Sequence, residues 1–367
     1  MKHIKISDII KCIEEFAPLH LQESYDNAGL VVGDKEKEIS KALVCIDITD
    51  DIIDEAINNS CELIISHHPL IFKGLKKLTG NGMVERIVIK AIKNDIAIYS
   101  AHTNLDNTFL GVNHIFAEKL GLKELKILAP KSNLLKKLVT FVPNDHLQNV
   151  RTSLFDAGAG HIGNYDNCSF NTKGTGSFRA SENTNPFVGN KNELHFEGET
   201  RLETIFPAWQ ENKIINSLIA SHPYEEVAYD IYPLDNTHHQ VGSGMIGILE
   251  SETDTLEFLN KVKEITKTDC IRHTNIIKDK VKKVAICGGS GSFLLSSAIR
   301  NNADVFITGD MKYHEFFNAD GKIIIADIGH YESEQFTMEL ISSIIKEKFS
   351  TFAIRLTEVN TNSIKYL

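Results

Sequence analysis

The sequence predicts an α/β protein built from two related α/β halves, with a ferredoxin-like α+β segment inserted between them. Three observations support this prediction. Apolar runs of strand length alternate with helical stretches near both ends of the chain, as in sheets covered by helices. Residues 42–68 and residues 283–310 share one pattern. Residues 127–240, which lie between these stretches, follow a different order of elements.

The N-terminal half begins with an amphipathic helix, which we expect Ser7 to cap and Pro18 to follow. A loop then leads into a short strand, with Gly29 and Gly33 as turn residues. Apolar runs and the helical stretches between them predict the remaining elements. We expect strands at 42–48, 63–69 and 95–102, and helices near 50–59, 82–94 and 108–120.

The middle of the chain changes character. It predicts a strand at 136–143, a helix at 144–158, a glycine-rich stretch with strand-like pieces, a helix from about 207 to 220 and a final strand. This order is typical of a ferredoxin-like unit.

Because the earlier pattern resumes after this segment, we interpret it as an insertion. The expected domains are a discontinuous α/β domain, 1–126 and 241–367, and an inserted domain, 127–240. The polar segment that contains His238 and His239 is expected to be the linker leaving the insertion.

The two halves match at polar positions as well as apolar ones. The matching positions are 242 residues apart in one stretch and 228 residues apart in a second. Both halves show the same order: a strand, a helix, a strand that ends in polar residues, and a further strand that ends in polar residues. The matching pairs are Cys45 with Cys287, His68 with Asp310, His102 with His330, and Asp106 with Glu334.

Composition excludes several classes of function. The 367 residues are 42% hydrophobic and carry a net charge of −10, which argues against broad binding to DNA or RNA and leaves a small phosphorylated ligand open. The six cysteines form no CxxC pair, and the chain has neither a signal-peptide pattern nor a membrane-spanning apolar run. We therefore expect a reduced, cytoplasmic protein with no membrane partner.

Metal-capable side chains gather at three expected strand ends. Open α/β sheets place their ligands at such ends, and imidazole with carboxylate suits Zn, Mn, Fe or Ni. About five such ligands suit two ions. The alternative is a turn at the adjacent histidines and an ordinary helix start at the last group. The three groups are His67 and His68, His102 and Asp106, and Asp327 with His330 and Glu334.

Two further segments have competing interpretations. His314 follows the strand end equivalent to His67 and is a candidate proton shuttle, or part of a solvated helix start. The loop 287–293 follows a strand and precedes a helix, so it is either a phosphate-binding loop or a tight turn.

Four motifs carry a resemblance to a known family. SHHPLIF, AHTNLD, GHYESE and YDNAGLVVG resemble the GTP cyclohydrolase I type 2 homologue family, also called NIF-three-like, over the whole chain. The segment from GAGHIGNYDNCSF to SHPYEEVAYDIYPL resembles the PII/CutA-like insertion of the longer bacterial members. Tyr25 departs from the pattern, since many members have Trp there.

The resemblance implies two divalent metal ions per chain, with zinc as the first choice and Mn, Fe or Ni as alternatives. It implies that Glu334 bridges the ions and that His102 is a ligand, a general base or a hydrogen-bond donor behind the ligands. It also implies a homohexamer with the metal sites facing an internal cavity. Carried over by position, the implied ligands are His67, His68, Asp106, His330 and Glu334.

Two functions stay open. The first is a metal-dependent hydrolase that activates water, with His102 and His314 handling protons, and with GTP ring opening or phosphoester hydrolysis as the reaction. Its substrate is a small molecule, and a nucleotide is one candidate. The second is a non-catalytic metal-binding regulator or metal-handling protein with a PII-like sensing insertion.

Overall fold

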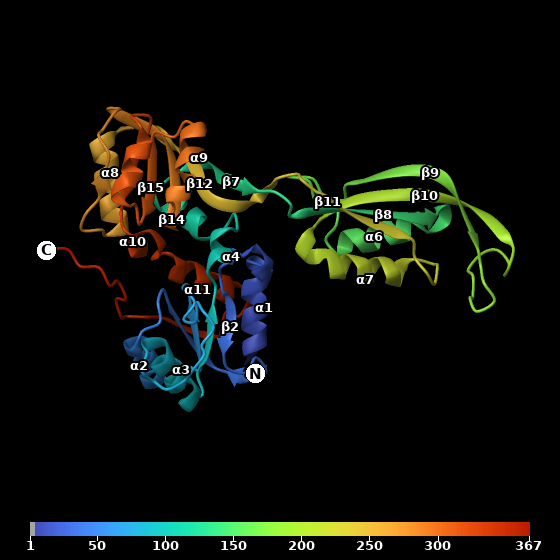
Figure 1. Ribbon diagram of the computed structural model, residues 1–367, viewed down its shortest axis with the longest axis horizontal. Helices are drawn as coiled ribbons and strands as arrows, with labels where there is room; N and C mark the ends of the chain where they lie inside the picture. The colour runs from blue at the N-terminus through green and yellow to red at the C-terminus, as the bar shows by residue number, and fades with distance from the viewer. Residues whose placement is uncertain (1–3) are drawn as a thin grey trace. The chain divides into compact units, whose positions relative to one another are not determined.

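The computed structural model describes residues 4–367. The chain forms two compact units: the first consists of the described residues up to Pro130 together with Gln240–Leu367, and the second of Lys131–His239. Each unit has its own sheet structure (Figure 1). Each also has its own hydrophobic core. No helix among the described residues is long and apolar enough to cross a lipid bilayer.

One half of the first unit is built on a five-stranded sheet in the order β17-β4-β5-β6-β2. The first four strands are parallel and β2 is antiparallel to β6. The strands are β2 (Gly29–Val32), β4 (Lys41–Cys45), β5 (Leu63–Ser66), β6 (Ala97–Ser100) and β17 (Ala353–Leu356). A separate antiparallel pair is formed by β1 (Ile4–Lys5) and β3 (Glu38–Ile39).

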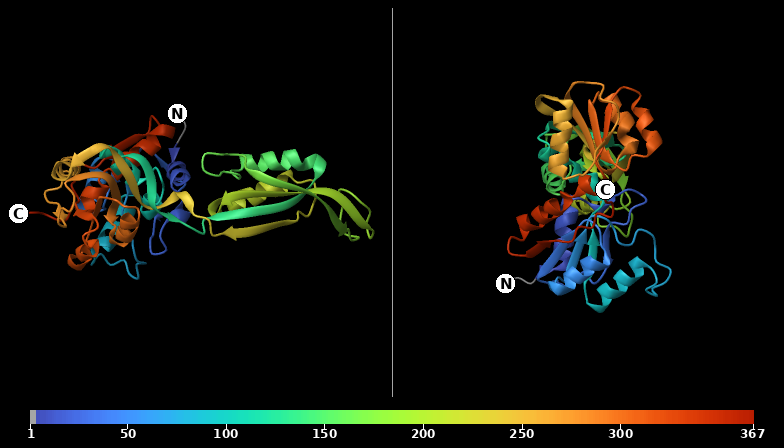
Figure 2. Two further views of the ribbon diagram at one scale, coloured as in Figure 1. Left: turned by 90° about the horizontal axis from the view of Figure 1, so that it is seen from above. Right: turned by 90° about the vertical axis from the view of Figure 1, so that its left-hand side faces the viewer.

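Helices cover both faces of this sheet, which explains why its central strands are buried and apolar throughout. On one face lie α1 (Ile6–Phe16) and α11 (Thr337–Lys348). On the other lie α2 (Asp50–Asn58) and α3 (Met83–Lys93). Both layers are visible in the right-hand view of Figure 2.

The other half of the first unit is built on a six-stranded sheet in the order β13-β16-β15-β14-β12-β7. Its strands are β7 (Lys123–Lys131), β12 (His238–Asp254), β13 (Arg272–His273), β14 (Lys280–Ser290), β15 (Val305–Gly309) and β16 (Ile324–Asp327). Here α5 (Val112–Lys119) and α8 (Thr255–Thr266) pack on one face and α9 (Leu295–Arg300) on the other.

The two sheets share a central arrangement. Each has three neighbouring parallel strands, β4-β5-β6 in one and β14-β15-β16 in the other. A short helix follows the third strand in both: α4 (Thr103–Asp106) after β6 and α10 (His330–Glu334) after β16. The predicted α/β class is therefore confirmed, and the offsets in the sequence connect equivalent places in the two sheets.

The predicted helix at 108–120 is wrong in its start. The chain instead forms α4, a turn and then α5, and the turn depends on Gly111. A Cβ at this position would lie 1.8 Å from the carbonyl oxygen of Leu105, so only glycine fits the close approach.

The second unit has a four-stranded antiparallel sheet in the order β11-β8-β10-β9. Its elements are β8 (Leu135–Pro143), α6 (Leu147–Asp156), β9 (Ser169–Arg179), β10 (Leu194–Pro207), α7 (Glu211–Ser221) and β11 (Tyr229–Leu234). This is the element order of a ferredoxin-like unit. Apolar residues of α6 and α7, including Val150 and Leu218, pack on the sheet and form the core of the unit.

Two local predictions are wrong. The first helix begins at Ile6, and the carboxylate of Asp8 accepts a hydrogen bond from the backbone N–H of Lys5, so Ser7 lies inside the helix and is not its cap. His238 and His239 begin the long strand β12, so the segment predicted as a linker is a strand.

Candidate metal centre

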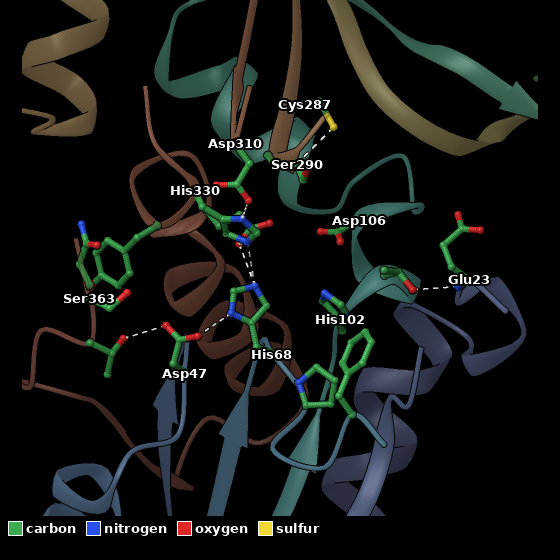
Figure 3. Close-up of a pocket in the computed structure, with 18 of the residues that line it drawn as sticks. Glu23, Asp47, His68, His102, Asp106, Cys287, Ser290, Asp310, His330 and Ser363 are labelled. Carbon is green, nitrogen blue, oxygen red and sulfur yellow. Dashed lines mark hydrogen bonds and ion pairs between the residues drawn. The ribbon is translucent and has the colours of Figure 1, made fainter. Parts of the chain in front are cut away.

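The metal-capable side chains of the first unit come from the carboxyl ends of its parallel strands. His67 and His68 follow β5 directly, and His102 follows β6 and precedes α4, which ends at Asp106. His330 and Glu334 begin and end α10, just beyond β16. The strand ends of both sheets thus bring these side chains to one place. Figure 3 shows four of them, His68, His102, Asp106 and His330.

Three of the donor atoms form a tight triangle. The Nε2 atoms of His68 and His330 lie 3.2 Å apart, and each lies 3.0 Å from Oε2 of Glu334. Ligand atoms that share a tetrahedral ion at about 2.0–2.1 Å lie about 3.3–3.4 Å from one another. The spacing of these three atoms therefore fits a single divalent ion.

The other oxygen of Glu334 faces a different group. Oε1 of Glu334 and Oδ1 of Asp106 each lie 3.6 Å from Nε2 of His67. His67 also belongs to a group with His68 and His102 whose donor atoms lie within 4.8 Å of one another. The carboxylate of Glu334, which is only 3% exposed, thus offers one oxygen to each of two histidine groups.

All four histidines use Nδ1 in the same way. Each Nδ1 lies within hydrogen-bond distance of an oxygen acceptor, which makes Nδ1 the protonated nitrogen and leaves Nε2 free to bind a metal. The pairs are His67 with the carbonyl of Ala101 at 2.8 Å, His68 with Asp47 at 2.7 Å, His102 with Asp26 at 2.8 Å, and His330 with Asp310 at 2.6 Å.

The carboxylates behind these histidines are themselves held in place. Oδ2 of Asp26, whose side chain is fully buried, accepts hydrogen bonds from the backbone N–H of Thr103 at 3.0 Å and from the Thr103 hydroxyl. Burial opposes ionisation, but the hydrogen bonds from His102 and Thr103 outweigh it and lower the pKa of Asp26 to about 2. Oδ2 of Asp47 accepts a hydrogen bond from the hydroxyl of Thr361 at 3.1 Å.

The sequence interpretation missed Asp26 and Asp47. Asp26 lies inside the motif YDNAGLVVG, and Asp47 comes two residues after β4 ends. Their positions offered a signal, because an acidic residue close to a strand end is a candidate partner for a histidine at the next strand end. Asp310 is the position in the second half of the chain that matches His68 in the first.

In the absence of an ion, the neighbouring carboxylates favour the protonated forms of two of the histidines. Burial disfavours protonation of His68 and His330, but hydrogen bonds to Asp47, Asp310 and Glu334 outweigh it and raise the pKa of His68 to about 10 and of His330 to about 11. Nε2 of the buried His67 has no hydrogen-bond partner among residues 4–367. A buried nitrogen without a partner is costly, and a bound cation would satisfy it.

Comparison with known proteins gives the family. Residues 4–363 match the family described as Duf34/NIF3 (NGG1p interacting factor 3). The chain belongs to this family. It is 40% identical to the GTP cyclohydrolase 1 type 2 homolog of Halalkalibacterium halodurans and 40% identical to the protein of the same name from Bacillus subtilis, each over 100% of both chains. The crystal structure of a Bacillus cereus protein related to NIF3 matches with a TM-score of 0.87 and 38% identity, over 100% of both chains.

A cavity of about 810 Å³ opens beside the histidines of this NIF3-family chain. His68, His102, Asp106, His330 and Glu334 line it, together with side chains of a different kind. These are three exposed aromatic rings, Tyr25, Phe72 and Phe293. The rings of Tyr25 and Phe72 lie 6.3 Å apart, and the ring of Phe72 lies 6.2 Å from that of His102.

The glycine-rich loop 287–293 supports Glu334 and does not form a phosphate cradle. Three of its backbone N–H groups already donate hydrogen bonds to side chains. Gly288 donates to Asn113, Gly289 to Ser333 and Gly291 to Thr308. Gly289 has φ 64°, and a Cβ there would lie 2.3 Å from Oε1 of Glu334. The tight-turn interpretation therefore fits the structure, and the glycine leaves space for the carboxylate.

The structure does not bring His314 to the other candidates. His314 is exposed on the 3-10 helix Tyr313–Ala319, and its ring packs against the rings of Tyr313 and Phe317. It does not line the cavity, whereas Asp310, four residues earlier, does. The catalytic role of His314 stays a prediction.

Proposed function

We propose that this NIF3-family chain is a metal-dependent hydrolase whose centre holds two divalent ions bridged by Glu334. The observation that carries the proposal is that the two oxygens of Glu334 face separate groups of donors. His68 and His330 would hold one ion, and His67 and Asp106 the other. Imidazole and carboxylate donors favour Zn, with Mn, Fe or Ni as alternatives.

Two ions bound at this place would supply hydrolytic chemistry, because they would lower the pKa of a water molecule and polarise an electrophile beside it. The chain itself contributes proton handling. Asp26 fixes the ring of His102, which lines the cavity and presents Nε2 to it. A histidine held in this way suits the role of general base or acid. Aromatic side chains, Tyr25 and Phe72, line the cavity on that side.

The substrate we propose is a small nucleotide. A cavity of about 810 Å³ is large enough for one, and the exposed rings of Tyr25 and Phe72 offer flat surfaces for a base. The relatives carry the name GTP cyclohydrolase 1 type 2 homolog, so GTP ring opening is the first reaction to test and phosphoester hydrolysis the second.

We further propose an oligomeric state, a cellular compartment and a character for the second unit. Exposed aromatic side chains, including Tyr313 and Phe317, support association of the first unit with further copies, and we propose the homohexamer that the sequence resemblance implies. All six cysteines are free, which fits the reducing cytoplasm. We keep the PII/CutA-like character of the second unit as a proposal supported by its ferredoxin-like order.

A second candidate is a metal-binding regulator that performs no reaction. The second unit favours it, because that unit has its own core and a cavity of its own, which hydrolysis at the first unit does not need. Such a protein would bind metal with the same donors and turn over no substrate.

Turnover by the metal-loaded protein separates the two candidates. We expect hydrolysis of GTP or of a member of a phosphoester panel in the presence of Zn, Mn or Fe. His68→Ala and Glu334→Ala should abolish it, while His273→Ala, which changes an exposed histidine, should leave it unchanged. Turnover that survives both substitutions contradicts the proposal, and metal binding without any turnover favours the regulator.

A further inference from the structure

The second unit contains a cavity of about 540 Å³ that the proposed function does not use. It lies where the end of β9, the following loop, β10 and the SHPYEE segment (221–226) meet. The residues that line it include Phe178, Phe187, Glu199, Tyr224 and Glu225, together with one cationic residue, Arg179.

Glu199 places a carboxylate in this cavity with little access to water. The residue is only 8% exposed, and its Oε1 accepts a hydrogen bond from the hydroxyl of Tyr224 at 2.9 Å. Within residues 4–367, no lysine, arginine or histidine nitrogen forms an ion pair with it. A buried carboxylate without a cation is costly, so the arrangement favours a cation from outside the chain.

The neighbouring strand is shaped around this carboxylate. Gly176 lies diagonally across from Glu199 on β9, and a Cβ at Gly176 would lie 2.1 Å from Oε2 of Glu199. The glycine therefore leaves the space in which the carboxylate lies. A larger residue at 176 would require the carboxylate to shift.

Aromatic rings form the walls. The ring of Tyr224 lies 5.9 Å from that of Phe178 and 6.3 Å from that of Phe187. Phe187 is 52% exposed, so one side of its ring is open to solvent and to a ligand. The faces of aromatic rings attract cations, and three rings beside a carboxylate resemble the cages that bind alkylammonium groups.

His222 positions Tyr224 without adding a charge. Its Nε2–H donates to the carbonyl of Phe141 at 3.0 Å, and its Nδ1 accepts the backbone N–H of Tyr224 at 3.1 Å. Burial lowers the pKa of His222, which keeps the ring neutral. The SHPYEE segment thus supplies a fixed neutral support at His222 and acidic side chains at Glu225 and Glu226, which lie exposed at the cavity.

We propose that this cavity binds an organic cation, an alkylammonium ion whose charged head pairs with Glu199 while its carbon chain packs against Phe178 and Phe187. The walls argue for an organic ligand over a bare metal ion. Among the described residues, the groups of three or more metal-capable side chains all lie at the centre in the first unit. Glu199 offers one buried carboxylate, which is too few ligands for a dedicated metal site.

The test is ligand-observed NMR and calorimetry on the metal-loaded full chain with n-butylammonium, using n-butanol and butyrate as neutral and anionic matches. We expect n-butylammonium to bind, and n-butanol and butyrate to bind at least tenfold more weakly. Glu199→Gln should weaken binding of n-butylammonium at least tenfold, because the amide keeps the shape and loses the charge. Phe187→Ala, at an exposed position that should not affect folding, should weaken it about threefold or more.

Two variants serve as controls. Glu193→Gln removes an exposed carboxylate that does not line the cavity, and Glu334→Gln changes the centre in the first unit. Both should bind n-butylammonium like the unaltered chain. Equal binding of all three probes, full binding by Glu199→Gln, no binding at tens of millimolar, or binding of divalent metal ions alone would each overturn the proposal.

Discussion

Asp26 holds His102 through a hydrogen bond of 2.8 Å between its Oδ1 and the imidazole Nδ1, although 76 residues separate the two in sequence. The same carboxylate accepts the backbone N–H of Thr103, so it fixes the start of α4 as well as the ring. His102 lines the cavity on the side of Phe72. The orientation of the proposed proton-handling group therefore depends on a residue that is not among the candidate metal ligands.

Asp26→Asn tests this dependence. The amide cannot stabilise the Nδ1–H tautomer as a carboxylate does, so we expect turnover or metal affinity to fall by about 10- to 100-fold. Steady-state kinetics and metal titration measure the two effects. Asp34→Asn, an exposed acidic residue shortly after β2, is the matched control and should change neither. Unchanged kinetics and affinity in Asp26→Asn would show that the ring needs no such support.

The same carboxylate predicts a pH dependence of stability. The folded-state pKa of Asp26 is about 2, below the ordinary 3.8, so its ionised form stabilises the fold above pH 3.8 and that contribution is lost as the pH falls through 2. Asp26→Asn should lower the free energy of unfolding by about 2 kcal/mol at pH 7. Denaturant unfolding should show the difference between the two proteins shrinking as the pH drops from 4 to 2. A difference that is constant over this range contradicts the assignment.

Metal binding should release protons. The pKa of His68 is raised to about 10 and that of His330 to about 11 in the ion-free protein, so both rings carry a proton at pH 7 that an ion must displace. We expect about two protons per ion at this part of the centre, and an apparent affinity that rises about tenfold per pH unit for each proton released. An indicator dye in weak buffer measures the release. Binding without a pH change would show that these rings are neutral.

Substitution of Gly289 tests whether this glycine sets the position of the Glu334 carboxylate. Gly289→Ala puts a Cβ within 2.3 Å of Oε1 of Glu334 at a residue with φ 64°, so the carboxylate must move. We expect metal affinity to fall at least tenfold. Gly174→Ala is the control, since a Cβ there meets nothing within 4 Å. Calorimetric titration of both variants with Zn²⁺ gives the comparison, and equal affinities would mean that the loop does not shape the centre.

The grouping of metal-capable side chains at strand ends could be predicted from the sequence, because it follows from the topology of a parallel sheet. Parallel strands bring their carboxyl ends to one edge of a sheet, so His67 after β5 and His102 after β6 must lie near each other. The offset that relates His102 to His330 pointed to the second sheet. What the pattern could not show is how the two sheets meet, which decides that His68 faces His330 at 3.2 Å.

The residues that hold the carboxylates behind the histidines could not be predicted from the sequence, for a different reason. Asp47 is held by Thr361, 314 residues later, in a segment without regular structure near the C-terminus. No periodicity marks such a contact. The start of β12 at His238 was missed because its polar, glycine-bearing sequence is typical of a loop, while pairing within a sheet overrides that local preference.

The metal content of the protein tests the central claim most directly. Protein purified without chelator and loaded with Zn²⁺ should hold two equivalents per chain by inductively coupled plasma mass spectrometry, because Glu334 presents an oxygen to each donor group. Glu334→Gln should hold one equivalent or fewer. Two equivalents in the unaltered chain and a loss in the variant are the predicted results. One equivalent or less in the unaltered chain, or two in Glu334→Gln, would contradict a centre bridged by this carboxylate.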